Sequence, residues 1–97
     1  MHTVLLKIVC KPGMKGTLLD ALRGALPDTR KYDGCKAVEV YTDQDEADAV
    51  VLWEKWASRE HYGRYFQWRV DTGLMDALGP LLAAPPVFMH MDNHGDI

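Results

Sequence analysis

The chain has 97 residues and a formal net charge of −3, with 47% hydrophobic and 26% charged residues. This composition is typical of one folded domain with a modest core, and its acidic balance argues against a nucleic-acid partner, which calls for a basic face. No apolar run approaches the ~20 residues of a membrane span, and the first residues lack the pattern of a signal peptide. We therefore expect a cytoplasmic protein that does not bind a membrane.

The first third of the chain predicts a strand followed by a helix. Residues 3–10 are β-rich and apolar on both faces, so we expect both faces to be covered, and Pro12 with Gly13 breaks the strand. Residues 14–26 carry leucines at helical spacing, which predicts a helix with one apolar face. We expect this helix to end at Pro27.

Two further strands are predicted in the middle of the chain. Asp33-Gly34 marks a turn, after which residues 36–42 and 49–56 both read as strands. A short acidic loop joins them, which favours an antiparallel hairpin.

The last part of the chain predicts a helix, a shorter helical segment and a strand. Ser58 is a good N-cap for a helix that starts at the next residue, and Gly73 suggests a break after it. A short leucine-rich helical segment follows, and then residues 87–91 form the last strand. The tail at 93–97 is polar, and we expect it to be loose.

The element order is therefore β-α-β-β-α-β, which predicts an α+β, ferredoxin-like fold with a four-stranded antiparallel sheet and helices on one face. We expect one domain over residues 1–97, with its core in 3–92. In this fold the strands next to Cys10 and Cys35 lie two places apart, or about 10 Å. A disulfide needs Cα atoms within about 7 Å, so we expect no intrachain bridge.

The face of the sheet away from the helices remains apolar. Leu5 and Val9 in the first strand point to it, as do Val51 and Trp53 in the third. An exposed apolar face of this extent marks an interface, and a twofold homodimer with the two sheets face to face would cover it.

Four segments, taken in their order and spacing, carry a family resemblance. Lys11-Pro12-Gly13 closes the first strand, and the segment from Arg30 to Cys35 leads into the second. Glu54-Lys55-Trp56-Ala57-Ser58 joins the third strand to the second helix, and the segment from Leu81 to Pro86 precedes the last strand. Over roughly residues 3–92 the chain resembles the antibiotic biosynthesis monooxygenase family.

The resemblance implies a dimeric α+β barrel with a pocket between the sheet and the helices of each subunit. Enzymes of this family include cofactor-free oxygenases of polyketide or quinol substrates, and haem-degrading relatives. Many members carry a histidine where this chain has Tyr65, and the haem-degrading ones use an asparagine on the first strand, whereas residues 3–12 contain none. Haem degradation is therefore disfavoured, and we expect no metal and no other cofactor.

Four side chains are candidates for catalysis in such a pocket. Trp56 corresponds to the family tryptophan and offers its indole N–H, or is a plain core residue. Tyr65 donates a hydrogen bond or relays a proton, or belongs to an aromatic core stripe. Arg69 stabilises an oxyanion, or forms a surface salt bridge. His90 has an unperturbed pKa that suits a base, or is structural.

Three further side chains are candidates for substrate binding. Tyr62 and Phe66 recur at helical spacing with Tyr65, a pattern shared by core packing and by a pocket wall. Glu54 has the same strand parity as Trp56. If it is buried there, its pKa rises and it can act as a base; a structural acceptor is the favoured alternative.

The leading interpretation is a cofactor-independent monooxygenase that acts on a small aromatic or quinol substrate between the sheet and the helices. The alternative is a non-catalytic dimeric binding protein, or a stress-linked protein, that holds a small hydrophobic ligand, because a fold does not determine a reaction.

Overall fold

The computed structural model describes all residues from 1 to 97, and its elements follow the predicted order, including the short helical segment after Gly73. A single 3₁₀ turn (η1) precedes the last strand. The elements are β1 His2–Val9, α1 Lys15–Lys31, β2 Cys35–Thr42, β3 Ala49–Trp56, α2 Arg59–Asp71, α3 Leu74–Leu78, η1 Gly79–Leu81 and β4 Val87–Met91.

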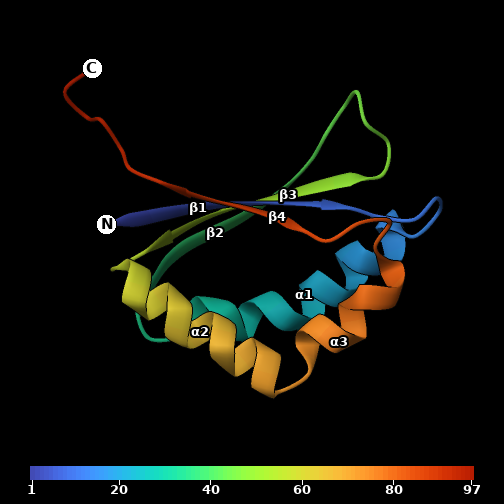
Figure 1. Cartoon of the computed structure of the whole chain (residues 1–97), viewed down its shortest axis with the longest axis horizontal. Coiled ribbons are helices and arrows are strands. Elements are labelled where there is room, and N and C mark those ends of the chain that lie inside the picture. The colour runs from blue at the N-terminus through green and yellow to red at the C-terminus, as the bar shows by residue number, and fades with distance from the viewer.

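The four strands form one antiparallel sheet in the order β2-β3-β1-β4. All the helices lie on one side of it (Figure 1). The predicted ferredoxin-like α+β fold is confirmed, including the position of β1 two places from β2. Cys10 and Cys35 are both free thiols.

Helix α1 is longer than its sequence pattern predicted. The expected end at Pro27 is wrong, because the helix continues through this proline to Lys31. An interior proline removes a backbone hydrogen bond and costs about 3 kcal/mol. Packing on both sides of the proline offsets that cost, since Leu26 and Thr29 are both buried against the rest of the protein.

The remaining helix boundaries follow their local signals. The Ser58 side chain accepts a hydrogen bond from the backbone N–H of His61 at 3.1 Å, which caps α2 as predicted. Gly73 has a φ of 88°, a left-handed conformation that suits glycine, and it separates α2 from α3.

The interior divides into two parts. An aliphatic core packs α1 against the sheet through residues such as Leu18, Leu22 and Val50. A separate aromatic cluster fills the space under α2 and consists of Val4, Trp56, Tyr62 and Tyr65. The boundary between these two parts is where the cavity described below opens.

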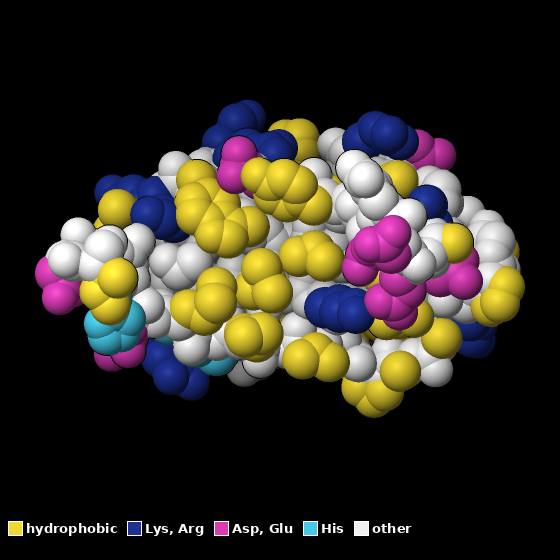
Figure 2. Space-filling view, turned by 90° about the horizontal axis from the view of Figure 1, so that it is seen from above, with side chains coloured by type: hydrophobic (Ala, Val, Ile, Leu, Met, Phe, Trp, Pro, Cys, Tyr) yellow, Lys and Arg dark blue, Asp and Glu magenta, His cyan; other side chains and the backbone are white.

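The helix-free side of the sheet, here called the open face, carries a broad group of apolar side chains (Figure 2). Tyr41, Val87 and Met89 are about half exposed there. Lys7 lies among them and forms an ion pair with Glu46 at 2.8 Å. No helix in the structure has the length and apolar character that crossing a bilayer requires.

Candidate functional site

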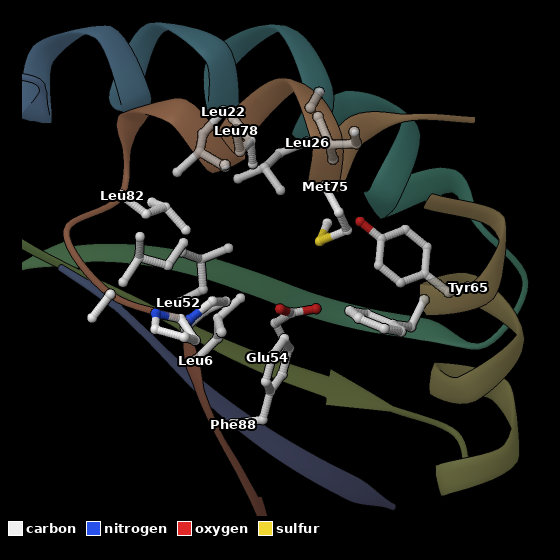
Figure 3. Close-up of a pocket in the computed structure, with 18 of the residues that line it drawn as sticks. Leu6, Leu22, Leu26, Leu52, Glu54, Tyr65, Met75, Leu78, Leu82 and Phe88 are labelled. Carbon is white, nitrogen blue, oxygen red and sulfur yellow. The ribbon is translucent and has the colours of Figure 1, made fainter. Parts of the chain in front are cut away.

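A cavity of about 440 Å³ lies between the helix-facing side of the sheet and the three helices (Figure 3). This size suits a small organic ligand. Sixteen of its twenty lining residues are hydrophobic. Strands contribute Leu6, Ile8, Leu52, Glu54 and Phe88, and helices contribute Leu22, Ala25, Leu26, Tyr62, Tyr65, Phe66, Leu74, Met75 and Leu78. The segment from Gly79 to Pro86 supplies the rest.

Glu54 is the only charged side chain that lines this cavity. It is 3% exposed and extends from β3 toward the cavity (Figure 3). Its Oε1 accepts a hydrogen bond from the indole Nε1 of Trp56 at 3.0 Å, and Oε2 has no hydrogen-bond partner in the protein. Burial raises the pKa of Glu54, and the bond from Trp56 opposes that rise only in part. The free oxygen is therefore available to take a proton from a ligand.

Tyr65 also lines the cavity, and its hydroxyl belongs to a buried network. Its Oη lies 2.6 Å from Thr29 Oγ1 and accepts a hydrogen bond from Arg69 Nε at 3.0 Å. Arg69 Nη2 also donates to Thr29 Oγ1 at 2.9 Å and to the Ala25 carbonyl at 2.7 Å. Burial raises the pKa of Tyr65, while its bonds with Thr29 and Arg69 oppose the rise. The network fixes the phenol in one orientation beside the cavity.

Arg69 is a buried cation with no carboxylate partner. Only 7% of it is exposed, and its guanidinium lies 4.5 Å from the ring centroid of Trp68. The alternative of a surface salt bridge is therefore wrong, because hydrogen bonds and a cation–π contact take its place. Arg69 does not line the cavity and contacts two residues that do, Tyr65 and Ala25.

The structure distributes the other predicted site residues over three places. Tyr62 and Phe66 line the cavity beside Glu54 and Tyr65. Trp56 is fully buried behind the cavity wall, where it holds Glu54. His90 lies outside the cavity in a second, more open groove, and its Nδ1 is 2.8 Å from His2 Nε2.

Two contributions to the site escaped the sequence analysis. Thr29 lies beyond the expected end of its helix, although its spacing of three from Leu26 continues the apolar face and is the signal that could have revealed it. Helix α3 was expected as a helical segment but not as a wall, and Met75 and Leu78 cover the cavity from it.

The site combines a largely apolar enclosure with one carboxyl group of raised pKa. An enclosure of this kind strengthens electrostatic interactions and keeps water from a reactive intermediate. No group of three or more His, Cys, Asp or Glu side chains is placed to hold a metal ion. The arrangement is suited to taking a proton from an apolar ligand.

Several solved structures have the same arrangement of sheet and helices as this chain. A structure described as an antibiotic biosynthesis monooxygenase is 22% identical, with a TM-score of 0.85 over 96% of this chain and 98% of that one. A Mycobacterium tuberculosis protein is 22% identical, with a TM-score of 0.83 over 95% and 93% of the two chains. A Methanosarcina mazei protein is 15% identical, with a TM-score of 0.86 over 95% and 91%. At these identities the likeness is one of fold.

Family membership follows from the sequence match. The model of the antibiotic biosynthesis monooxygenase family matches residues 1–69, and the chain belongs to this family. No protein among those with curated functions matches it.

Proposed function

We propose that the protein is a cofactor-independent monooxygenase that oxidises a small aromatic phenol or quinol in the cavity between the sheet and the helices. The observation that carries the proposal is the Glu54 carboxylate, buried in an apolar cavity with one oxygen unpartnered. Membership of the antibiotic biosynthesis monooxygenase family supports the reaction class.

The proposed reaction begins with proton transfer from the substrate hydroxyl to Glu54 Oε2. The resulting anion gives one electron to O₂, and the two radicals combine at a ring carbon as a peroxide. Glu54 returns its proton to this peroxide. The protonated peroxide then loses water, which carries away the hydrogen of the same ring carbon, and leaves a quinone that contains one atom of the O₂. The protein supplies the base, the orientation and the exclusion of water. The electron-rich substrate supplies all four electrons, two when the peroxide forms and two when it loses water.

Tyr65 has a supporting role in this proposal. Its Oη accepts from Arg69 and pairs with Thr29, so its position is set before a ligand enters. When Thr29 is the donor in their shared bond, the phenol proton is free to reach the substrate oxygen. Such a donor stabilises the anion that forms when Glu54 takes the proton.

The direct test is oxygen consumption with a panel of anthrols and naphthoquinols, with product analysis after turnover in ¹⁸O₂. We expect one O₂ to be consumed for each quinone formed, with one labelled atom retained. If compounds of the panel bind but the protein does not raise the rate of oxygen consumption with any of them, the alternative of a non-catalytic ligand-binding protein is favoured. The apolar lining of the cavity suits that alternative equally well.

Replacing Trp56 by Phe is expected to shift the acid limb of the pH–rate profile to higher pH. The indole N–H lowers the pKa of Glu54, so its loss raises that pKa, and a higher pH is needed to ionise the base. The measurement is kcat/KM against pH. Trp53→Phe, on the open face, is the matched control and should leave the limb in place. If the acid limb of the kcat/KM profile lies at the same pH in Trp56→Phe, Glu54 is not the group whose ionisation sets that limb.

We propose further that two copies associate through the open face. Val51 and Trp53 point to this face from the centre of the sheet, beside the exposed Val87 and Met89. Burial of apolar surface is the dominant favourable contribution to most associations.

Light scattering at micromolar concentration is expected to give twice the 11.0 kDa mass of the chain. Val51→Glu should give a monomer, because it places a charge in the interface. Val70→Glu introduces the same charge on α2, at a site that is 42% exposed, and should remain a dimer. A monomeric mass for the unmodified protein would contradict the proposed association.

A further inference from the structure

A second hollow of about 400 Å³ lies beside the cavity and is more open to solvent. This outer groove is lined by Arg59, Tyr62, Gly63, Phe66, Phe88 and His90. Its three aromatic residues, Tyr62, Phe66 and Phe88, also line the cavity. The ring centroids of Phe66 and Phe88 lie 5.4 Å apart, edge to face. The outer groove and the cavity are therefore the two sides of one aromatic wall.

The charges on the two sides of this wall are opposite. The cavity side carries only the Glu54 carboxyl, whereas the outer groove is lined by Arg59 and His90 and by no carboxylate. Arg59 is exposed and forms no ion pair within the chain. Its positive charge acts on His90, whose pKa is lowered by burial first and by Arg59 next.

His90 is held in place by His2. The two rings stack with centroids 5.0 Å apart, and His2 Nε2 lies 2.8 Å from His90 Nδ1. This contact occupies Nδ1 and leaves Nε2 of His90 without a partner in the chain. When His2 is the donor, Nε2 of a neutral His90 carries the proton and can donate to an anion.

We propose that the outer groove is a subsite for an anionic group on the substrate, so that the substrate class is an aromatic acid with an apolar ring body. Arg59 pairs with the acid group, and His90 Nε2 donates a hydrogen bond to it. The ring body packs on Tyr62, Phe66 and Phe88, which lead to the cavity. The inference rests on the proposed function, because it takes the cavity as the place where the ring is oxidised.

The separation of charge explains why the acid group stays outside. A carboxylate inside the cavity would face ionised Glu54 without a cation lining the space, and like charges at short range in an apolar enclosure repel strongly. In the outer groove the same group meets a cation and a hydrogen-bond donor, and charge-assisted hydrogen bonds are the stronger kind. A substrate with its acid group in the outer groove and its ring in the cavity satisfies both sides.

The test is isothermal titration calorimetry with 2-naphthoate and its neutral isostere 2-naphthamide. We expect 2-naphthoate to bind about tenfold more tightly, as one charge-assisted contact allows. Arg59→Gln should remove this preference. Arg64→Gln, an exposed arginine on the same helix that does not line the groove, should retain it. Imidazole signals of His90 should shift on addition of 2-naphthoate.

The proposed subsite would be overturned if the two probes bind with equal affinity or if neither binds. It would also be overturned if Arg59→Gln and Arg64→Gln lose the preference for 2-naphthoate to the same extent. These outcomes are distinct from failure of the proposed function. If 2-naphthoate is preferred through Arg59 but the protein consumes no oxygen with any quinol, the subsite is supported and the proposed reaction is rejected. Oxygen consumption with neutral quinols, without a preference for 2-naphthoate, would support the reaction and reject the subsite.

Discussion

Replacing Glu54 by Gln is expected to lower kcat for quinol oxidation by roughly 10²–10⁴-fold, the usual contribution of a general base. Glutamine keeps the shape of the side chain and can still accept the hydrogen bond from Trp56, but it cannot take the substrate proton. The measurements are steady-state oxygen uptake, and calorimetry to show that ligand binding persists. Glu39→Gln, on an exposed residue of β2, is the matched control and should retain full activity. Retention of more than about a tenth of the activity in Glu54→Gln would place the base elsewhere.

The same substitution has a predictable effect on stability. Burial raises the pKa of Glu54 above the ordinary carboxyl value of 4.5, so the folded protein holds this proton at a pH where the unfolded chain has released it. The contribution of Glu54 to stability is therefore greatest below 4.5 and is lost as the pH rises through the raised value. At pH 8, Glu54→Gln should melt at the same temperature as the unmodified protein or at a higher one. Its stability should not show the decrease with rising pH that ionisation of Glu54 causes in the unmodified protein. A variant that melts well below the unmodified protein at pH 8 would contradict the assignment.

Replacing Gly34 by Ala is expected to reduce the free energy of unfolding by about 3 kcal/mol. Gly34 has a φ of 90°, and a left-handed conformation costs about 1–2 kcal/mol for a residue with a Cβ. A Cβ there would also overlap the His61 ring, and overpacking of this kind costs about 1–3 kcal/mol. The measurement is denaturant unfolding of the purified variant.

A second glycine and a double variant separate these two costs. Gly13 has a φ of 81° with nothing within 4 Å of a built Cβ, so Gly13→Ala should lose only the backbone part, about 1–2 kcal/mol. Adding His61→Ala to Gly34→Ala should recover the steric part. Equal losses in Gly13→Ala and Gly34→Ala would show that the His61 ring moves aside without cost. Gly34 precedes Cys35, which pairs with Trp56 in the sheet, so a shift there also disturbs the residue that holds Glu54.

Much of the fold was predictable, because its signals are local. The third and fourth strands occupy residues 49–56 and 87–91 as the alternation of side chains indicated, and Ser58 and Gly73 bound α2 through chemistry that acts within a few residues. The end of α1 was not predictable in this way. Pro27 is a strong local stop signal, and only the burial of Thr29 in the folded protein shows why the helix continues past it.

The candidate site was predictable only in part. Strand parity placed Glu54 and Trp56 on one face, but parity does not tell which side chain reaches an empty space and which is covered by a helix. In the folded chain α2 covers Trp56, while the carboxyl of Glu54 reaches the gap between the aromatic cluster and the aliphatic core. Arg69 is buried because Thr29 and Ala25, forty or more residues away, supply its acceptors.

The sequence by itself determined the arrangement of strands and helices, the apolar open face of the sheet and the family, since each depends on residue type and spacing along the chain. Only the tertiary structure decided which carboxyl lies inside the cavity and that an arginine and a histidine lie outside it. Nothing in the sequence sets Glu54, Arg59 and His90 apart from other ionisable residues. The packing of α2 against β3 and β4 places one of them in an apolar space and the other two beyond an aromatic wall, and that separation depends on contacts between distant segments.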